Sequence, residues 1–315
     1  MRWHLLLLTI KTINKMQIKT IKKAIKTKVE EWLKSITDAE LLKEVEKNLL
    51  VSGGCITNMF LGEDVNDYDI YLMDKNVLVK LAEYYCKEFP NIEIMKGWEK
   101  EKLLSQFTAE GVDDDFMFAK KIAIDNLKPE QVKLYFDEKN GGIRVNEDKE
   151  KAAGLYVPVF FSPNAISLTD KIQIVLRFTG DAKAIHENYD FLHATNYYTT
   201  KDGLVLNQKA LESILTKQLM YQGSKYPLTS IIRVRKFLKR QWNINAGELL
   251  KIMFQISELD LKNPNVLEEQ LIGVDVAYFG KLIEILRNAK PEGGLTSGYL
   301  NTIIDKVFSE SEETL

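Results

Sequence analysis

Two aspartates one residue apart, Asp67 and Asp69, shortly follow a glycine pair, Gly53-Gly54. In an extended strand, side chains at positions i and i+2 point to the same face, about 6.6 Å apart along the chain. Asp67 and Asp69 are therefore expected to face one side, with Tyr68 on the other. Magnesium prefers carboxylate oxygens together with substrate phosphates. The pair thus has the chemistry to hold magnesium beside a triphosphate.

The segment Ser52-Gly53-Gly54 offers the complementary phosphate site. Glycine has no Cβ, so backbone N–H groups approach phosphate oxygens closely there. A helix starting near Thr57 would add the favourable dipole of its N-terminus. Two metals ~3.5–4 Å apart would then activate a hydroxyl and neutralise a leaving pyrophosphate. The alternative is a simple turn followed by solvated acids. The order and spacing, with an apolar strand before and apolar alternation after, favour the joint site.

Ser52-Gly53-Gly54 followed by Asp67-Tyr68-Asp69 resembles the active-site signature of the nucleotidyltransferase superfamily, which includes DNA polymerase β and CCA-adding enzymes. The signature covers about residues 48–75. The resemblance implies an enzyme that uses Mg²⁺ or Mn²⁺ and an NTP such as ATP. A longer pattern over about 45–290 is similar to nucleotidyltransferases encoded by bacteriophages. It includes Ser162–Ile166, Lys171–Phe178, Tyr189–Phe191 and Gly223–Pro227.

The resemblance also implies a third carboxylate on a later strand, and Asp190 is our choice for it. Its neighbours in Asn188–His193 suggest a strand that emerges into a cleft. Asp170 is the rival, but Thr169-Asp170-Lys171 is more typical of a turn between two strands. The acidic run Asp113–Asp115 is a third candidate and is more typical of a solvated loop. Asp190 could also be an ordinary acid at a strand edge.

Composition sets the outer limits of these hypotheses. The chain has 315 residues, 45% of them hydrophobic and 28% charged, which suits a globular protein of two domains. Its net charge of −2 gives no overall signal for nucleic acid, so any such binding needs a local patch. Two cysteines without metal-ligand spacing indicate reduced thiols in a cytoplasmic protein. Three histidines form no cluster, so a zinc site is not expected.

The N-terminus combines a leucine run, Leu5–Leu8, with many lysines. The apolar stretch ends by Ile10, which is too short for a membrane span, and no signal cleavage site follows. Met16 opens a cleaner amphipathic helix, so we interpret it as the natural start and residues 1–15 as an upstream extension. The alternatives are a basic arm that touches nucleic acid or a partner, and a solvated helix with a lysine-rich face.

Hydrophobic periodicity predicts an α+β protein: a nucleotidyltransferase-like mixed β-sheet domain with flanking helices, followed by an all-α domain. The predicted parts are a helical segment at 1–45, the sheet domain at 46–204, the helical domain at 205–308 and an acidic tail at 309–315. Short strands, with a hairpin turn at Asn140–Gly142, form an insertion at about 91–145. Strands are also expected over 157–168, 172–178 and 190–198, and a late helix near 279–286.

The predicted helical domain carries the best local positive patch. Arg233, Lys236 and Arg240 would form a stripe opposite Ile231, Val234 and Leu238. Such a stripe suits the phosphates of a nucleotide or of RNA, or it is a solvated helix face. In the turn just upstream, Lys225 would meet a triphosphate and Tyr226 would stack on a base. Packing of Tyr226 against Pro227 is the alternative.

These features lead to one main hypothesis. It is a magnesium-dependent nucleotidyltransferase that moves an NMP from an NTP to an acceptor hydroxyl. An RNA 3′ end, tRNA included, is the leading acceptor, and the alternatives are a protein hydroxyl and a small molecule. Asp67, Asp69 and Asp190 would hold metal, while Ser52, Gly53, Gly54, Lys225, Tyr226, Arg233 and Lys236 would bind the nucleotide. One alternative is a catalytically inactive phage protein with the same fold that serves as a binding or structural module. Another is a toxin- or defence-type transferase that modifies tRNA or protein. The sequence specifies no oligomeric state.

Overall fold

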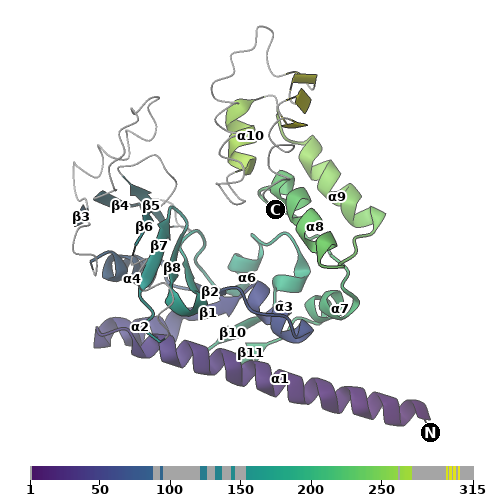
Figure 1. Ribbon diagram of the computed structural model, residues 1–315, viewed down its shortest axis with the longest axis horizontal. Coiled ribbons are helices and arrows are strands. Elements are labelled where there is room, and N and C mark those ends of the chain that lie inside the picture. The colour runs from purple at the N-terminus through teal and green to yellow at the C-terminus, as the bar shows by residue number, and fades with distance from the viewer. Residues whose placement is uncertain are drawn as a thin grey trace. The chain divides into compact units, whose positions relative to one another are not determined.

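A computed structural model describes residues 2–87, 93–94, 121–125, 132–136, 143–145, 154–261, 263–271 and, near the C-terminus, 296, 298–299, 301–302 and 304–305. The chain divides into two compact units (Figure 1). The first unit comprises residues 1–186 and 193–215, and the second comprises residues 187–192 and 216–315. The chain therefore leaves the first unit after His186 and returns to it at His193. The domain limits predicted above remain predictions.

The first unit contains the strands and helices around the motif. The helical segment expected at 1–45 is present, and so are the apolar strand before the glycine turn, the helix after the turn and the strand that carries Asp69. The elements are α1 (Arg2–Lys34), α2 (Ala39–Asn48), β1 (Leu49–Ser52), α3 (Gly54–Leu61), β2 (Tyr68–Leu72), α4 (Lys75–Lys87), β3 (Glu93–Ile94), β4 (Lys121–Asp125), β5 (Lys133–Phe136), β6 (Ile143–Arg144), β7 (Pro158–Ser162), β8 (Ala165–Leu168), β9 (Ile172–Val175), α6 (Ala182–His186), β10 (Tyr197–Thr199), β11 (Gly203–Val205) and α7 (Gln208–Thr216).

The described strands form a large mixed sheet and a small one. The large sheet has eight strands in the order β11-β10-β1-β2-β9-β8-β7-β6, and β3-β4-β5 form the small sheet. Within the large sheet only β2 and β9 run parallel among the described pairs, and the others are antiparallel. The mixed sheet with added helices confirms the predicted α+β class. β6 extends the large sheet at its edge, so the 91–145 region contributes to both sheets.

One face of the large sheet packs into the hydrophobic core. Residues paired in register on neighbouring strands share a face. On this face the paired residues are Tyr198, Val51, Ile70, Ile174, Ile166 and Phe161, and all of them are buried. Helices α1, α2 and α4 contribute to the same core. Because side chains alternate along a strand, the neighbouring residues must face the other way.

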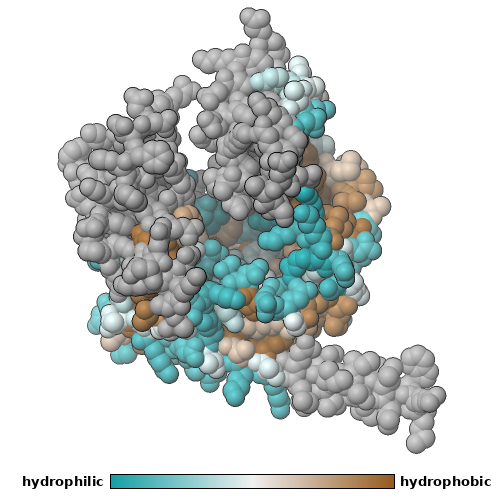
Figure 2. All heavy atoms as spheres, in the orientation of Figure 1, coloured by the Kyte–Doolittle hydropathy of each residue, from teal (hydrophilic) through white to brown (hydrophobic). Residues whose placement is uncertain are grey.

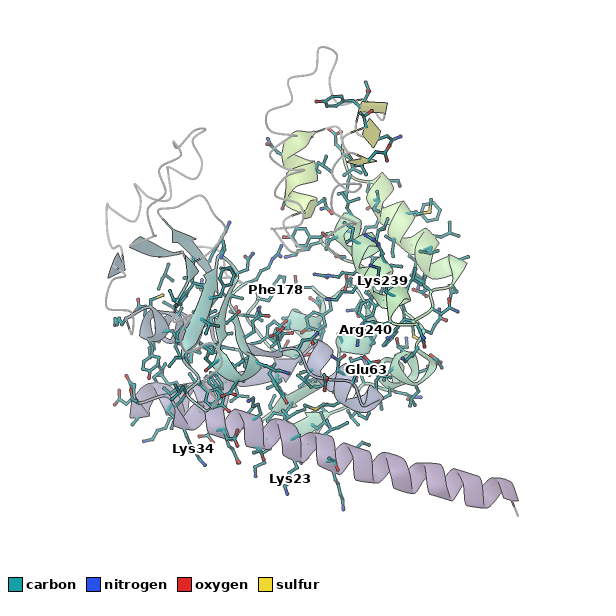
Figure 3. All side chains as sticks on the ribbon, in the orientation of Figure 1. Lys23, Lys34, Glu63, Phe178, Lys239 and Arg240 are labelled. Atoms are coloured by element: carbon teal, nitrogen blue, oxygen red, sulfur yellow. The ribbon has the colours of Figure 1, made fainter. Side chains whose placement is uncertain are left out.

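Helix α1 covers part of this core through an apolar stripe. Ile21, Ile25, Val29 and Trp32 recur at helical spacing, and all are buried. Lys23 and Lys34 point away from the sheet on the opposite side of the helix (Figure 3). The part of α1 whose side chains are described thus has the lysine-rich solvated face that was one of the expectations. None of the helices in the described residues, α1 included, is long and apolar enough to cross a bilayer.

A hydrogen bond inside the core joins α1 to α4. The indole Nε1 of Trp32 donates to the hydroxyl of Tyr85 over 2.9 Å, and both side chains are buried. Tyr85→Phe should therefore lower the free energy of unfolding by about 1–3 kcal/mol, because the buried indole N–H loses its acceptor. Chemical denaturation measures this loss. The matched control is Tyr84→Phe. The Tyr84 hydroxyl forms hydrogen bonds with exposed Thr37, so its removal should lower the free energy of unfolding by under about 0.5 kcal/mol. Equal losses would contradict the assignment.

The second unit is helical in the residues described. It contains α8 (Pro227–Lys239), α9 (Ala246–Ser257) and α10 (Pro264–Leu271), and these confirm the predicted C-terminal helices. The expected helix near 279–286 and the acidic tail lie outside the described residues. So do the acidic run Asp113–Asp115 and the hairpin turn at Asn140–Gly142.

Two expectations about strands are wrong. The segment 157–168 is not one strand but the hairpin β7–β8, which turns at Pro163-Asn164. Asp170 lies in the turn that follows, as expected, with φ 58°. The segment 190–198 does not start as a strand of the sheet, because Phe191 pairs with Tyr221 in the second unit. A short 3-10 helix, Leu192–Ala194, then precedes β10.

Candidate functional site

The face of the large sheet opposite the core carries a row of polar side chains. Ser52 on β1 pairs in register with Asp69 on β2, and Asp69 pairs with Gln173 on β9. Tyr197 on β10 and Ser167 on β8 extend the row on either side. Asp67 immediately precedes β2 and is exposed, while Asp69 is half-buried. The structure therefore brings the glycine turn and the acidic pair together through the pairing of β1 with β2.

The turn between β1 and α3 has a backbone that depends on glycine. Gly53 has φ 96° and ψ −151°, a conformation that residues with a side chain rarely adopt. Its N–H donates to the carbonyl oxygen of Ala194. Helix α3 then begins at Gly54, and within the described part of the chain no side chain caps its first turn. A Cβ added at Gly54 would meet no atom of the described residues within 4 Å. The start of α3 is thus open to an anionic group, whose charge the helix dipole favours.

The side chain of Ser52 is turned inward and holds this turn in place. It is fully buried, and its Oγ lies 2.9 Å from His186 Nε2 and 3.0 Å from the carbonyl oxygen of Asn196. The carbonyl oxygen of Ala194 is a third neighbour, at 3.2 Å. With these partners, the hydroxyl is not available to a nucleotide. Any contribution of Ser52 to nucleotide binding would come through the position of the turn.

Burial and mutual repulsion set the electrostatics of the acidic pair. Burial, and then the negative charge of Asp67, raise the pKa of Asp69 to about 7. Burial and then Asp69 also raise the pKa of the Cys55 thiol. Cys55 is therefore an unreactive thiol, since the thiolate is the nucleophile. A cation between the two carboxylates would relieve their repulsion.

His186 remains neutral at ordinary pH. Burial lowers its pKa to about 4, against a smaller opposing effect of Asp181. Its ring also packs edge-on against Tyr197, with the ring centroids 5.7 Å apart. Neutral imidazole fits the contact with the Ser52 hydroxyl, because one ring nitrogen donates while the other accepts.

The depressed pKa of His186 predicts a pH-dependent stability. The unfolded chain takes up the proton near pH 6.5 and the folded chain only near pH 4. Stability is therefore lost as the pH falls through this window. We expect His186→Gln to remove about 1–2 kcal/mol of this dependence, since partial exposure weakens the effect. Urea denaturation at pH 4.5 and 7.5 measures it as the difference between wild type and variant. A difference that does not change with pH would contradict the assignment.

No group of three or more histidine, cysteine, aspartate or glutamate residues in the described part of the chain has the arrangement of a metal site. The two aspartates nevertheless fit magnesium, which is commonly held by one or two carboxylates with phosphates and water. The observation in favour is the half-buried carboxylate of Asp69 on β2, whose pKa is raised by burial and then by the negative charge of Asp67. A nucleotide would have to supply the remaining ligands.

The remaining predicted site residues belong to the second unit. Asp190 is buried and forms an ion pair with Arg233, Oδ2 to Nη1, at 2.8 Å. Its backbone carbonyl accepts from the Gln222 N–H, so its loop is held to residues 220–222. Asp190 thus has a structural partner, and its role as the third carboxylate remains a prediction.

The basic and aromatic residues of α8 and its preceding turn are mostly at the surface. Lys225 and Lys236 are exposed, and Tyr226 is half-buried just before Pro227. Lys239 and Arg240 project from the end of α8 (Figure 3). The predicted apolar side of α8 is only partly correct. Val234 is buried, but Ile231 is 44% and Leu238 is 49% exposed. Nucleotide contacts by Lys225, Tyr226, Arg233 and Lys236 remain predictions.

Two residues of the site were missed by sequence reasoning. His186 meets Ser52 across more than a hundred residues of chain, and Gln173 meets Asp69 at a similar separation. No local motif marks either residue, because both contacts form only when distant segments of the chain come together in the fold. Only a correct sheet topology would have found them.

Comparison with known families decides the relationship. A model of the Gabija anti-defense 2 family matches residues 23–217, which is more than half of the chain. The chain belongs to the Gabija anti-defense 2 family. The match covers β1, α3 and β2, so the turn and the acidic pair lie within the family region. The expected similarity to phage proteins is confirmed by a relative, Gabija anti-defense 2 of Bacillus phage SPbetaL7, which is 21% identical over 275 residues.

That alignment covers 86% of this chain and 52% of the relative, so the chain spans about half the length of the curated relative it matches. Among solved structures, a CCA-adding enzyme in complex with CTP is similar, with 16% identity, a TM-score of 0.37 and coverage of 77% of this chain and 48% of that one. The Thermotoga maritima CCA-adding enzyme complexed with tRNA is also similar, with 13% identity, a TM-score of 0.37 and coverage of 91% and 69%. The expected similarity to nucleotidyltransferases is thus present, but TM-scores below 0.5 support no statement about chemistry.

Proposed function

We propose that the protein counteracts Gabija defence through a nucleotide site in its first unit. The observation that carries this proposal is the register of Ser52 with Asp69, which puts the open start of α3 beside the acidic pair. The backbone N–H groups at Gly54 would bind phosphate oxygens, and Asp67 and Asp69 would hold Mg²⁺ or Mn²⁺. The family name supports the biological target.

The reaction that suits this site is nucleotidyl transfer. An acceptor hydroxyl oxygen attacks the α-phosphorus of an NTP, and the bond to the bridging oxygen of the β-phosphate breaks. Pyrophosphate leaves and the hydroxyl proton passes to water. When bound, the cation would neutralise charge on the phosphates. The turn at Gly53-Gly54 would hold the triphosphate in position, and the fixed Ser52–His186 contact would keep the turn in that shape.

We propose a Gabija defence protein as the acceptor in place of an RNA 3′ end. The family assignment supports a protein target, whereas the basic stripe on α8 is weaker than expected. Arg233 in that stripe is engaged by Asp190. The ring of Phe237 lies 5.7 Å from the guanidinium carbon of Arg240. An RNA acceptor would predict a steep loss of affinity with salt.

The test uses purified Gabija proteins, Mg²⁺ and each NTP labelled at the α-phosphate. Transfer of label to a Gabija protein, with release of pyrophosphate, is the expected result. Label on RNA added to the same reaction would restore the RNA acceptor. Nucleotide binding without any transfer of label would favour a second function, in which the protein acts by binding alone.

The second candidate function rests on an apolar surface of α9. Leu250, Met253 and Phe254 are 49%, 60% and 68% exposed, and apolar atoms gather over α9 in Figure 2. A contiguous patch of exposed apolar side chains commonly marks a site of contact with another protein. Such a surface would bind a Gabija protein whether or not nucleotide transfer follows.

Polar substitutions on this surface should impair binding to a Gabija protein without affecting the nucleotide site. We expect Met253→Ser with Phe254→Ser to abolish protection of phage against Gabija, while NTP affinity stays within about twofold of wild type. Plaque counts on Gabija-expressing cells and nucleotide titration measure the two effects. Lys251→Ser on the same helix is the matched control and should protect fully. Full protection by the double variant would exclude this surface.

A further inference from the structure

Gln173 stands beside the acidic pair on the site face of the sheet. It pairs in register with Asp69 across the parallel strands β2 and β9. Neighbouring strands lie about 4.8 Å apart, and paired side chains share a face. Ile172 and Ile174, on either side of Gln173, are buried in the core. Their burial fixes the side chain of Gln173 on the same face as the Asp69 carboxylate.

The amide of Gln173 is only loosely held. It is half-buried, and its Nε2 donates to Ser167 Oγ over 3.5 Å, which is long for a hydrogen bond. A weak bond of this kind can be exchanged for a ligand at low cost. An amide offers two N–H donors and one neutral oxygen. The donors suit a phosphate oxygen, whereas a neutral oxygen is a poorer ligand for a divalent ion than a carboxylate.

The charge of the site matches one divalent ion. Asp67 and Asp69 together bring two negative charges, which balance one Mg²⁺ or Mn²⁺. The next position in the polar row is the neutral Gln173, and beyond it lies Ser167. A second ion close to the first would have to rely on phosphate oxygens and water, because the neutral Gln173 offers no anionic oxygen at the next position of the row.

We propose that Gln173 contacts the phosphates of the bound nucleotide and limits the site to a single divalent ion. The inference rests on the proposed function, since it concerns the same nucleotide site. It differs from the sequence expectation of two metals. The third carboxylate expected for that arrangement, Asp190, is paired with Arg233 in the second unit.

Counting bound Mn²⁺ tests the proposal. The protein is titrated with Mn²⁺ in the presence of α,β-methylene NTP analogues, each base in turn, and free Mn²⁺ is measured by electron paramagnetic resonance. We expect one Mn²⁺ per wild-type chain at saturation. Gln173→Glu should bind two, because the added carboxylate supplies the missing ligand. Gln173→Ala should keep one ion but bind the analogue about three- to tenfold more weakly.

The outcomes separate this inference from the proposed function. Two ions on the wild-type protein, or one ion on Gln173→Glu with wild-type thermal stability, would overturn the inference and leave the nucleotide site intact. Unchanged analogue affinity in Gln173→Ala would overturn the phosphate contact. Absence of both Mn²⁺ and analogue from the wild-type protein would contradict the proposed function itself.

Discussion

Asp69→Asn should lower nucleotidyl transfer, or Mg²⁺-dependent NTP retention, by at least about 100-fold while the fold is preserved. An amide removes the negative charge that would hold the cation but keeps the size of the side chain. The substitution sits where β2 pairs with both β1 and β9, so it acts at the centre of the proposed site. Labelled-NTP transfer and nucleotide titration with and without Mg²⁺ measure the loss.

The same substitution should stabilise the metal-free protein at neutral and higher pH. The pKa of Asp69 is raised to about 7 in the folded chain, so the folded state keeps a proton that the unfolded state releases near pH 4. The stability that this proton contributes is present below pH 4 and is lost as the pH rises through 7. A neutral amide in place of the carboxyl group avoids that loss. The variant should therefore gain on the order of 2 kcal/mol at pH 8 and nothing at pH 4.

Asp64→Asn is the matched control for this prediction. Asp64 is exposed and lies on the loop before β2, where its backbone carbonyl accepts a hydrogen bond from the Asn58 amide. That bond does not involve the carboxylate, so the control should leave transfer, NTP affinity and stability unchanged. If Asp69→Asn retained full activity, or if it destabilised the metal-free protein at pH 8, the proposed site would have to be abandoned.

The two glycines of the turn should respond differently to alanine. Gly53→Ala should lower the free energy of unfolding by about 1–3 kcal/mol, because φ 96° and ψ −151° are strained for alanine. Gly54→Ala should leave stability equal or raise it by up to about 1 kcal/mol, since its Cβ at the start of a helix meets no atom of the residues that the structure describes.

The effect of the Gly54 substitution on nucleotide affinity tests the proposed function. Gly54→Ala should reduce NTP affinity by at least about tenfold, because its Cβ would occupy the space into which a phosphate must come. Isothermal titration with MgNTP and a denaturation curve on the same sample measure both properties. A stable Gly54→Ala protein with wild-type affinity would show that phosphates do not approach the start of α3.

The motif itself was predictable from the sequence because its parts are local. Val51, Ser52, Gly53 and Gly54 specify a buried strand end followed by a glycine turn, and the structure has β1 and α3 there. Apolar alternation around Asp69 was enough to place β2. Each of these signals lies within a few residues of chain, where the rules for strands, turns and helix starts apply directly.

The surroundings of the motif were not predictable because they depend on distant pairings. Gln173 reaches Asp69 only through the parallel pairing of β2 and β9, which no local pattern encodes. Phe191 pairs with Tyr221 of the second unit, so Asp190 follows a different path from the predicted strand. The turn at Pro163-Asn164 was hidden within a run that resembles one long strand.

The most direct test of the nucleotide site is anomalous X-ray scattering from a crystal of the protein soaked with Mn²⁺ and a methylene-bridged NTP analogue. Our account predicts a manganese peak between the carboxylates of Asp67 and Asp69, with phosphate density against the backbone of Gly53 and Gly54. Manganese and nucleotide bound elsewhere, with this turn and these acids empty, would contradict it.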